Sequence, residues 1–480
     1  MRILRVVFSH YPLVIYLAFF TIVFSIKIIS NPFPFFDWDE SIYAQVGREM
    51  IQAKSYFVPM WQGDFWLDKP PLVPLFYGIV MSITPFMMPE ISTRLSTLFL
   101  SVCALVLLYK LYWSVVKETW LATTMIVATS LTSIFLQRAQ VLNVDIFLLI
   151  GWLGYFLFRK YFVVSLVFLG VAVYSKSLIG LYPLGVLLLY HTYQYATKQC
   201  SLRDLGSVIL RMSLQALVLL SWHMVMTYVF GQEFLYKHFY ESHVKRVTAS
   251  IESHFGQRTF YITLLAEQYG SYAIFSVLGG IILAFQWLTK KISDSSLLRS
   301  VFFVPWFLFL NLTKTKIFWY GHPYLGQFAF LMLYPLTLLR KYGLFYFGII
   351  AIILFSMLNY HFRENTVLDD FYSSEEDHHT IARFAKNRCE NLAVVIPPEG
   401  RVANKTLSDM NLLISTSRWW GSHPSMVYYF EGPVEFVYEE ERIKELQNTQ
   451  SGCVALSKDD IIYMSPRTPI MSLGSMNLYQ

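Results

Sequence analysis

The sequence YPLVIYLAFFTIVFSIKII at residues 11–29 contains one charged side chain, Lys27, among 19 residues. About 20 predominantly apolar residues are enough for an α-helix to cross the hydrocarbon core of a bilayer. The run is too long for the apolar part of a cleavable signal peptide, and it lacks a small-residue cleavage site. We therefore expect this segment to be retained as the first transmembrane span.

The composition of the whole chain agrees with a membrane protein. Of 480 residues, 55% are hydrophobic, 18% aromatic and 15% charged, and the mean hydropathy is +0.44. Soluble proteins carry about 25% charged residues and could not bury this much apolar surface. Ordinary Gly and Pro contents and only four Cys exclude disordered, collagen-like and disulfide-scaffold chains. Lys and Arg flanking the spans explain the net charge of +6, which does not indicate nucleic-acid binding.

The composition changes after about residue 360. Residues 362–480 contain 11 Lys and Arg against 17 Asp and Glu. A polar helical run at 439–447 and four short β-rich runs predict a small α/β domain there; the β-rich runs are residues 392–396, 426–430, 434–438 and 453–456. We expect an all-α polytopic membrane domain over residues 1–361, with about 11 to 13 transmembrane helices plus juxtamembrane helices, followed by an extracytoplasmic α/β domain over 362–480.

The positive-inside rule orients the spans. With Arg2 and Arg5 in the cytoplasm, the cytoplasmic turns carry Lys110/Lys117, Arg159/Lys160, Lys198/Arg203, Lys290/Lys291 and Arg340/Lys341. The later spans are expected near residues 94–112, 119–137, 145–158, 162–175, 178–196, 208–229, 267–288, 300–313, 317–338 and 343–360. This scheme requires that residues 72–88, which are interrupted by Pro74 and Pro85, form a re-entrant or interfacial helix.

In this topology the remaining conspicuous ionisable residues lie on the exterior face. Asp37, Asp39 and Glu40 follow the first span, and a helix starting near Asp39 would place Asp39 and Tyr43 on one face. The alternative for this group is an acidic helix cap solvated at the membrane surface. Lys69 precedes two prolines that fix an extended chain, which suits phosphate binding, although a membrane-surface anchor is the alternative.

Further ionisable residues stand where apolar runs end. Asp145 closes the string LNVD and needs a partner or a site in an apolar span, unless it is a plain helix-terminal carboxylate. Lys176 lies between two apolar runs with no room for a long loop, which favours a functional role. Two later groups of polar residues have two interpretations each. The first group either binds an anion or forms a solvated polar loop; it contains Glu241, His243, Lys245, Arg246, His254 and Arg258. The second either binds an anion or anchors the chain at the membrane surface; it contains Lys314, Lys316, Tyr320 and His322.

Together these residues place acids and cations on one side of the bilayer. Cations that neutralise a phosphate and a carboxylate that activates an acceptor suit a reaction on a lipid-linked phosphate. The histidines lack the close His/Cys pairs of zinc motifs, so metal binding is the lesser interpretation of the later loop.

Several of these strings resemble a known family. DESIYA at 39–44, REM at 48–50 and DKPPL at 68–72 resemble the first exterior loop of the GT-C glycosyltransferases related to protein O-mannosyltransferases, above all the lipid A aminoarabinose transferase (ArnT) branch. Similar pieces follow in the family's order, namely Arg138 to Asp145, Ser175-Lys176, Trp222-His223, the Glu241/His243/Arg246 stretch, and Lys316 with Tyr320 and Pro323. The branch usually has Arg where this chain has Ile42, and Glu where it has Asp68.

The resemblance implies a GT-C fold and transfer of a sugar from a polyprenyl-phosphate donor, such as an undecaprenyl phosphate sugar, on the outer face of the cytoplasmic (inner) membrane. It implies that Asp39 is the essential carboxylate and Asp145 the second acid. The residues that it associates with substrate are Glu40, Lys69, Lys176, Glu241, His243, Arg246, Lys316 and Tyr320. Attack opposite the departing phosphate predicts inversion at the anomeric carbon, with lipid A or a related glycolipid as acceptor.

Three alternatives stay open at this stage. The acceptor could be protein Ser/Thr, and a transporter is the rival from another class, although no internal repeat is visible and the charges lie on one face. The scheme requires no cofactor, and a divalent ion at Glu40 or His243 is left open. Cys389 and Cys453 both lie in the exterior tail, where an oxidising compartment permits the disulfide that we predict between them.

Overall fold

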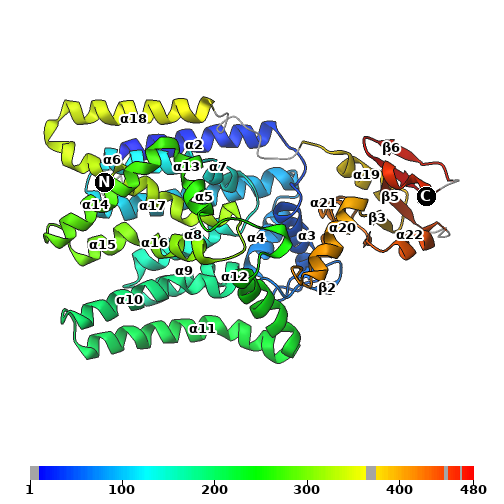
Figure 1. The fold of residues 1–480 in the computed structure, drawn as a ribbon, viewed down its shortest axis with the longest axis horizontal. Helices are drawn as coiled ribbons and strands as arrows, with labels where there is room; N and C mark the ends of the chain where they lie inside the picture. Colours follow the sequence, from blue (N-terminus) through cyan, green and yellow to red (C-terminus); the bar gives the residue numbers. More distant parts are fainter. Residues whose placement is uncertain (1–9, 364–373, 448–451, 465–466) are drawn as a thin grey trace.

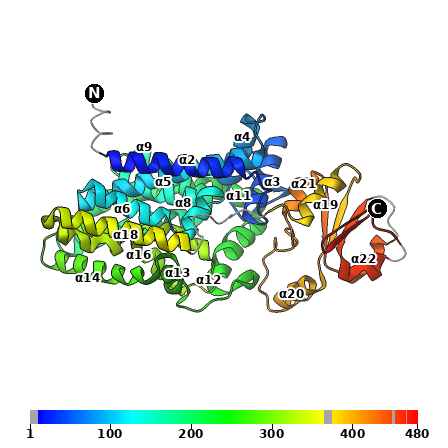
Figure 2. The ribbon, with the colours of Figure 1, turned by 90° about the horizontal axis from the view of Figure 1, so that it is seen from above.

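The computed structural model describes residues 10–363, 374–447, 452–464 and 467–480. A long bundle of helices occupies one end of the molecule and a small sheet the other, and the two ends meet where α21 packs on α3 (Figure 1). The view from above shows the same division, with α19 and α22 beyond the end of the bundle (Figure 2). Arg2 and Arg5, on which the predicted orientation depends, lie outside the described residues.

The bundle is built from helices of very different lengths. In chain order they are α2 (Tyr11–Ser30), α3 (Asp39–Gln52), α4 (Leu72–Ile83), α5 (Pro89–Val116), α6 (Thr119–Ser130), α7 (Ser133–Gln140), α8 (Asp145–Phe158), α9 (Phe162–Lys176), η1 (Ser177–Leu181), α10 (Tyr182–Ala196), α11 (Leu202–Phe234), η2 (Leu235–Lys245), α12 (Arg246–Thr248), η3 (Ile251–Ser253), α13 (Phe260–Tyr269), η4 (Gly270–Ala273), α14 (Ile274–Leu288), α15 (Asp294–Val301), α16 (Val304–Leu312), η5 (Phe318–Gly321), α17 (His322–Leu333), η6 (Tyr334–Tyr342) and α18 (Leu344–Arg363). A short hairpin, β1 (Met60–Trp61) and β2 (Asp64–Phe65), lies between α3 and α4.

Several of these helices are long and apolar enough to cross a bilayer, so the chain is a multi-span membrane protein. Among the described residues, five helices meet this test, and the number reaches seven when two bent pairs each count as one span. The larger number expected from the sequence stays a prediction, because several apolar helices are short. One of these, α4, has 12 residues and rises about 18 Å, well under the roughly 30 Å of a bilayer core. That length agrees with the expectation that this segment does not cross.

Two expected spans have a different shape in the structure. The run expected as one straight span at 119–137 is bent by 76° between α6 and α7. Hydroxyls at the bend explain it, because Ser130 Oγ bonds to Ile126 O and Thr132 Oγ1 to Thr129 O, which competes with the helical ladder. The bend places α7 beside the start of α3, where Arg138 contacts Asp39. The run expected at 300–313 is likewise divided, between α15 and α16, with a bend of 44°.

The chain reverses sharply after α9. Ser177 has a φ of +54°, and a Cβ on Gly180 would lie 2.4 Å from Val173 N. In a straight helix these two residues would stand about 10 Å apart along the axis, so α10 turns back from α9 rather than continuing it. The two separate spans expected at 162–175 and 178–196 stay a prediction, because residues 162–196 count as one candidate span by length and composition.

The tail forms a mixed five-stranded sheet. Its elements are α19 (Asp377–Lys386), β3 (Leu392–Val395), α20 (Pro398–Asp409), α21 (Ser425–Phe430), β4 (Val434–Val437), α22 (Glu440–Leu446), β5 (Cys453–Ser457), η7 (Lys458–Met464), β6 (Met471–Leu473) and β7 (Met476–Tyr479). The strand order is β4-β3-β5-β7-β6, in which β3 pairs in parallel with β4 and β5, and β7 pairs antiparallel with β5 and β6. The expected strands at 392–396, 434–438 and 453–456 and the helix at 439–447 are therefore present.

One strand expectation is wrong. Residues 426–430 belong to the helix α21, and all six of its residues are buried. A short apolar run buried on every side lacks the polar face that separates a helix from a strand, so its pattern cannot decide between them. Contacts with α3 and α19 decide it instead; Arg48, for example, lies 4.2 Å from the ring centroid of Tyr428.

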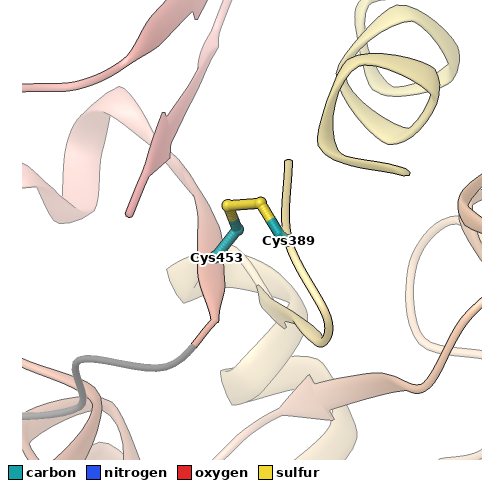
Figure 3. Close-up of a disulfide and its surroundings, with 2 residues drawn as sticks. All are labelled: Cys389 and Cys453. Atoms are coloured by element: carbon teal, nitrogen blue, oxygen red, sulfur yellow. A yellow bond between two sulfur atoms is a disulfide. The ribbon is translucent and has the colours of Figure 1, made fainter. Parts of the chain in front are cut away.

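The tail is cross-linked internally and packed against the bundle. Cys389, just after α19, and Cys453, at the start of β5, form the predicted disulfide (Figure 3). Cys103 and Cys200, which lie outside the tail, are free. Residues of α21 share one apolar core with the bundle, and the predicted boundary at 361/362 falls at the end of α18. The division into two domains therefore stays a prediction.

Candidate active site

The first candidate acid, Asp39, begins α3 as the sequence predicts. The residue before it, Trp38, has a φ of +72°, a strained conformation that is found mainly where the surroundings impose it. Arg138 Nη1, from α7, lies 3.3 Å from Asp39 Oδ2, and the guanidinium also lies 4.7 Å from the ring centroid of Trp319. The Asp39 side chain remains 34% exposed, so a partly open carboxylate faces a fixed cation.

Its neighbour Glu40 has a closed environment. Arg94 donates to it twice, Nε to Oε1 at 3.0 Å and Nη2 to Oε2 at 2.7 Å, and both side chains are only 1% exposed. The backbone N–H groups of Leu142 and Phe36 also donate to the carboxylate. The guanidinium in turn donates to the carbonyls of Phe33 and Pro34. Glu40 therefore ties the loop before α3 to α5 and the loop before α8.

The second candidate acid, Asp145, lies at the start of α8. Lys176 Nζ donates to its Oδ1 at 2.8 Å, and both residues are buried. The same ammonium lies 4.3 Å from the ring centroid of Tyr320. Asn143 connects this pair to the first one, because its amide donates to Arg138 O and its Oδ1 accepts from Ile146 N at the start of α8.

Lys69 is the least neutralised cation of the group. No hydrogen bond or ion pair joins its ammonium to another residue in the described part of the chain. Burial, together with the like charges of Arg246 and Lys176, lowers its pKa to about 8. The adjoining Asp68 is buried, which raises its pKa, and its carboxyl accepts from the Thr416 hydroxyl of the tail. Lys69 is thus a half-buried cation held among other cations, which favours binding of an anion.

A buried polar chain fixes the two lysine segments relative to each other. The Ser177 hydroxyl lies 2.7 Å from His238 Nε2 and 3.0 Å from His223 Nε2, and His238 Nδ1 lies 2.9 Å from Leu67 O. A carbonyl can only accept, so with neutral rings His238 donates from Nδ1 and accepts the Ser177 proton at Nε2. His223 must then donate from Nε2 to Ser177 Oγ. This chain runs from the residue after Lys176 to the segment that carries Lys69.

These side chains lie where two cavities meet. The first cavity, of about 420 Å³, is mainly apolar and is lined by residues such as Ile179, Trp306 and Leu310. The second, of about 700 Å³, lies beside Asp39, Arg138 and Asp145. Six residues line both cavities: Asp68, Lys69, Lys176, Ser242, Arg246 and Tyr320. Three of the six are cations, so positive charge is concentrated at the junction.

The tail supplies much of the wall of the second cavity. Residues from the end of β3 to the start of α21 line it together with those of the bundle, namely Ile396, Gly400, Ala403, Asn404, Leu407, Leu413, Ile414, Thr416, Ser417, Trp420, Gly421 and Ser422. None of these was a candidate from the sequence, because an apolar or uncharged polar side chain in a tail carries no local signal of a shared cavity. Arg94 and Trp319 were missed because their partners, Glu40 and Arg138, are distant in the sequence.

Apart from Arg246 at the junction, the other predicted residues lie at the edge of the site or away from it. His243 lines the apolar cavity, and Arg246 Nη2 lies 3.5 Å from Glu252 Oε2. Glu241 accepts from the backbone N–H and hydroxyl of Ser415, so it anchors the tail. Lys316 lines neither cavity; its ammonium donates to the carbonyls of Leu310 and Asn311 at the end of α16. Arg258 is exposed and lines neither cavity.

The possible metal ligands in the structure differ from Glu40 and His243, which the sequence left open as ligands. Both oxygens of Glu40 are occupied by Arg94 and backbone donors. Among the described residues, one Asp/His group brings its possible ligand atoms within 4.8 Å of one another: Asp37, His378 and His423. It lies between the first loop and the tail and includes neither Glu40 nor His243.

The comparisons with known proteins show that this chain shares its fold with solved membrane-protein structures of two kinds, ArnT and the oligosaccharyltransferase AglB. No family profile matches the sequence. An uncharacterised protein of Aquifex aeolicus (strain VF5) is 23% identical over 221 residues, which cover 44% of this chain and 43% of the length of that relative.

The particular structures that this chain resembles are ArnT and AglB. ArnT from Cupriavidus metallidurans bound to undecaprenyl phosphate matches with a TM-score of 0.68 over 97% of both chains, at 12% identity. The archaeal oligosaccharyltransferase AglB from Archaeoglobus fulgidus, in complex with an inhibitory peptide and a dolichol-phosphate, matches with a TM-score of 0.60 at 11% identity. That match covers 95% of this chain and 70% of AglB. A second AglB structure, in complex with Zn and sulfate, matches with a TM-score of 0.59 at 11% identity over 94% of this chain and 68% of AglB.

Proposed function

We propose that this protein is an inverting glycosyltransferase. It would move a sugar from a polyprenyl-phosphate donor to lipid A or a related glycolipid on the outer face of the cytoplasmic membrane. The observation that carries this proposal is the junction of an apolar cavity and a polar cavity at Lys69, Lys176 and Arg246. An amphiphile with a chain, a phosphate and a sugar has the same order of chemical groups.

The donor fits this arrangement group by group. The isoprenoid chain would occupy the apolar cavity beside Ile179 and Trp306, and its phosphate would lie at the junction. Each charge-assisted contact to the phosphate contributes about 1.5–3 kcal/mol. Lys69 is the strongest candidate for the first such contact, because it has no partner of its own among the described residues. Lys176 is shared with Asp145, and Arg246 with Glu252.

Transfer would use Asp39 as the group that receives a proton. The acceptor hydroxyl oxygen attacks the anomeric carbon, its proton passes to Asp39, and the bond from that carbon to the donor phosphate breaks. The electron pair of that bond stays on the phosphate, where the cations stabilise the developing charge. Asp39 is open enough for an acceptor to reach it, and the contact with Arg138 orients it. Attack from the side opposite the phosphate inverts the anomeric carbon.

The remaining predicted residues would act through position. Glu40 fixes the start of α3 through Arg94 and so orients Asp39. Asp145 holds Lys176 at the junction, with Tyr320 beneath the ammonium. Glu241 holds the tail over the second cavity through Ser415. The tail would therefore help to shape the acceptor site.

The choice of acceptor rests on the comparisons. The structure that matches this chain over 97% of both lengths is ArnT, which supports a lipid acceptor. Protein O-glycosylation is the second candidate, and the AglB complex with a peptide is the observation that favours it. Deleting the gene and comparing mass spectra of lipid A and of glycopeptides separates the two. Loss of a sugar-sized mass from lipid A supports the first, and loss from peptides would replace it by the second.

Transfer itself is tested with purified protein. Membranes or nanodiscs containing the protein, a polyprenyl-phosphate sugar and an acceptor lipid should yield glycosylated lipid and free polyprenyl phosphate in equal amounts. Movement of the donor across the bilayer without release of polyprenyl phosphate would instead indicate a transporter and would contradict the proposal.

A further inference from the structure

The loop between α2 and α3 meets the tail at a cluster of two imidazoles and one carboxylate. Asp37 comes from this loop, His378 from the first turn of α19, and His423 from the segment before α21. His378 Nε2 lies 3.1 Å and His423 Nδ1 3.0 Å from the same atom, Asp37 Oδ2. We propose that these three side chains bind a divalent transition-metal ion, with zinc as the best match, and that this ion fastens the tail to the first exterior loop.

The spacing of the three atoms fits such an ion. All three possible ligand atoms lie within 4.8 Å of one another. Zinc binds imidazole nitrogen and carboxylate oxygen at about 2.0–2.2 Å, which separates neighbouring tetrahedral ligands by about 3.3–3.6 Å. The two nitrogen–oxygen distances are a few tenths of an ångström shorter than this separation. A small outward movement of each side chain would therefore admit the ion between them.

Polar groups lie behind two of the three proposed ligands. The other oxygen of Asp37, Oδ1, accepts from the backbone N–H of Ser425 at 3.0 Å. The other nitrogen of His378, Nδ1, lies 3.6 Å from Glu376 Oε2. A carboxylate behind a histidine fixes its tautomer and raises its basicity in many zinc sites. His423 is 30% exposed, so a water molecule can complete a four-ligand set from that side.

The same contacts suit a metal better than a simple ion pair. The His378 side chain is 3% exposed, yet its Nε2 makes no well-directed hydrogen bond among the described residues. The His378 and His423 rings stack with centroids 3.9 Å apart and an angle of 18° between planes. Two protonated rings in that arrangement would repel each other, whereas two neutral rings that share one cation would not. Asp37 Oδ2 would then coordinate the ion together with His378 Nε2 and His423 Nδ1.

An ion at this position would stabilise the loop before Asp39 and its contact with the tail. Asp37 lies two residues before Asp39, so an ion here would fix the loop that leads into the candidate active site. It would also join α19 to the segment before α21, and both belong to the tail that walls the second cavity. The metal site would be present whatever reaction the cavity performs, so its test is independent of glycosyl transfer.

Metal content provides the direct test. The full chain is purified in detergent without a polyhistidine tag, supplied with ZnCl₂, desalted, and measured by plasma mass spectrometry beside His423→Gln, Asp37→Asn and the control His191→Gln, which lies in α10. We expect about one zinc per chain in the wild type and the control, and at least a tenfold loss of zinc affinity in the two cluster variants. No bound zinc in the wild type, or full retention of zinc by both cluster variants, would overturn the proposal.

A second measurement needs only the wild-type protein and so does not depend on the folding of variants. Zinc should raise the Tm of the full chain and a chelator should reverse the rise, because a ligand that binds only the folded state stabilises it. Cobalt added to the chelated protein should give the visible absorption of a tetrahedral site. A Tm that responds to neither zinc nor chelator would leave the cluster as a plain contact between Asp37 and the two histidines and would overturn the metal.

Discussion

Two regions at the start of α3 hold adjacent carboxylates in opposite ways. Around Glu40 the region is closed: Arg94 binds both oxygens, and each side chain is 1% exposed. Around Asp39 the region is open, with one 3.3 Å contact to Arg138 and a carboxylate that is 34% exposed. A carboxylate with every oxygen occupied can hold a loop in place, whereas one with a free edge can also meet a substrate. The comparison therefore supports the proposed positioning role of Glu40 and the proposed chemical role of Asp39.

The largest expected effect belongs to the open region. Asp39→Asn keeps the shape of the side chain but removes the proton acceptor, and we expect sugar transfer to fall by about 10²- to 10⁴-fold. The Tm in detergent should change little, because the lost ion pair is partly exposed. Initial rates of polyprenyl phosphate release measure the effect. Full transfer by a folded Asp39→Asn variant would remove Asp39 from its proposed role.

The closed region should show the reverse pattern. Arg94→Leu leaves Glu40 buried without its cation, and removing one partner of a buried ion pair costs about 3–5 kcal/mol of stability. We expect a lower Tm and less folded protein on size-exclusion chromatography, with transfer per folded molecule reduced less than in Asp39→Asn. If Arg94→Leu kept its Tm and lost transfer selectively, the assignment of the two regions would have to be exchanged.

Lys69 tests the junction between the cavities with a smaller effect. Lys69→Gln should weaken binding of polyprenyl phosphate by about 10- to 100-fold, the equivalent of one charge-assisted contact. Lys316→Gln is the matched control, because that lysine lines neither cavity and donates to carbonyls at the end of α16. Tryptophan fluorescence or thermal-shift titration measures both variants. Equal losses of affinity in the two variants would show that Lys69 does not contact the phosphate.

The pH dependence of donor binding also tests whether Lys69 contacts the donor phosphate. The pKa of Lys69 lies near 8 rather than 10.5, so its positive charge is present below this value and is lost as the pH rises through it. A polyprenyl-phosphate sugar is a diester without a titration in this range, so its affinity should be constant near pH 6–7 and fall between about pH 7.5 and 9.5. Lys69→Arg should move this fall to higher pH, since arginine stays charged. An unchanged profile in Lys69→Arg would mean that another group titrates.

The sequence predicts features whose cause is local. The start of α3 at Asp39 follows from acids that precede a helical pattern, and three strands of the tail from short β-branched runs. The disulfide follows from two cysteines in one exterior segment. The candidate acids and most of the cations also stand at the ends of apolar runs, where charges are expensive without a partner.

The features that sequence cannot predict depend on distant partners. Glu40 and Arg94 lie 54 residues apart, and only the packed bundle shows that they neutralise each other. Lys316 has the same sequence signature as Lys176, but it caps a helix instead of lining a cavity. The strand expected at 426–430 is a helix, because burial on every side removes the pattern that separates the two. The wall that the tail gives to the second cavity likewise exists only after folding.

The most direct measurement is an experimental structure of this protein with polyprenyl phosphate bound, determined by cryo-electron microscopy in nanodiscs. The account predicts the isoprenoid chain beside Ile179 and Trp306, and the phosphate within hydrogen-bond distance of Lys69 or Arg246, with its free side toward Asp39. A phosphate bound away from the junction, or a chain seated outside the apolar cavity, would contradict it.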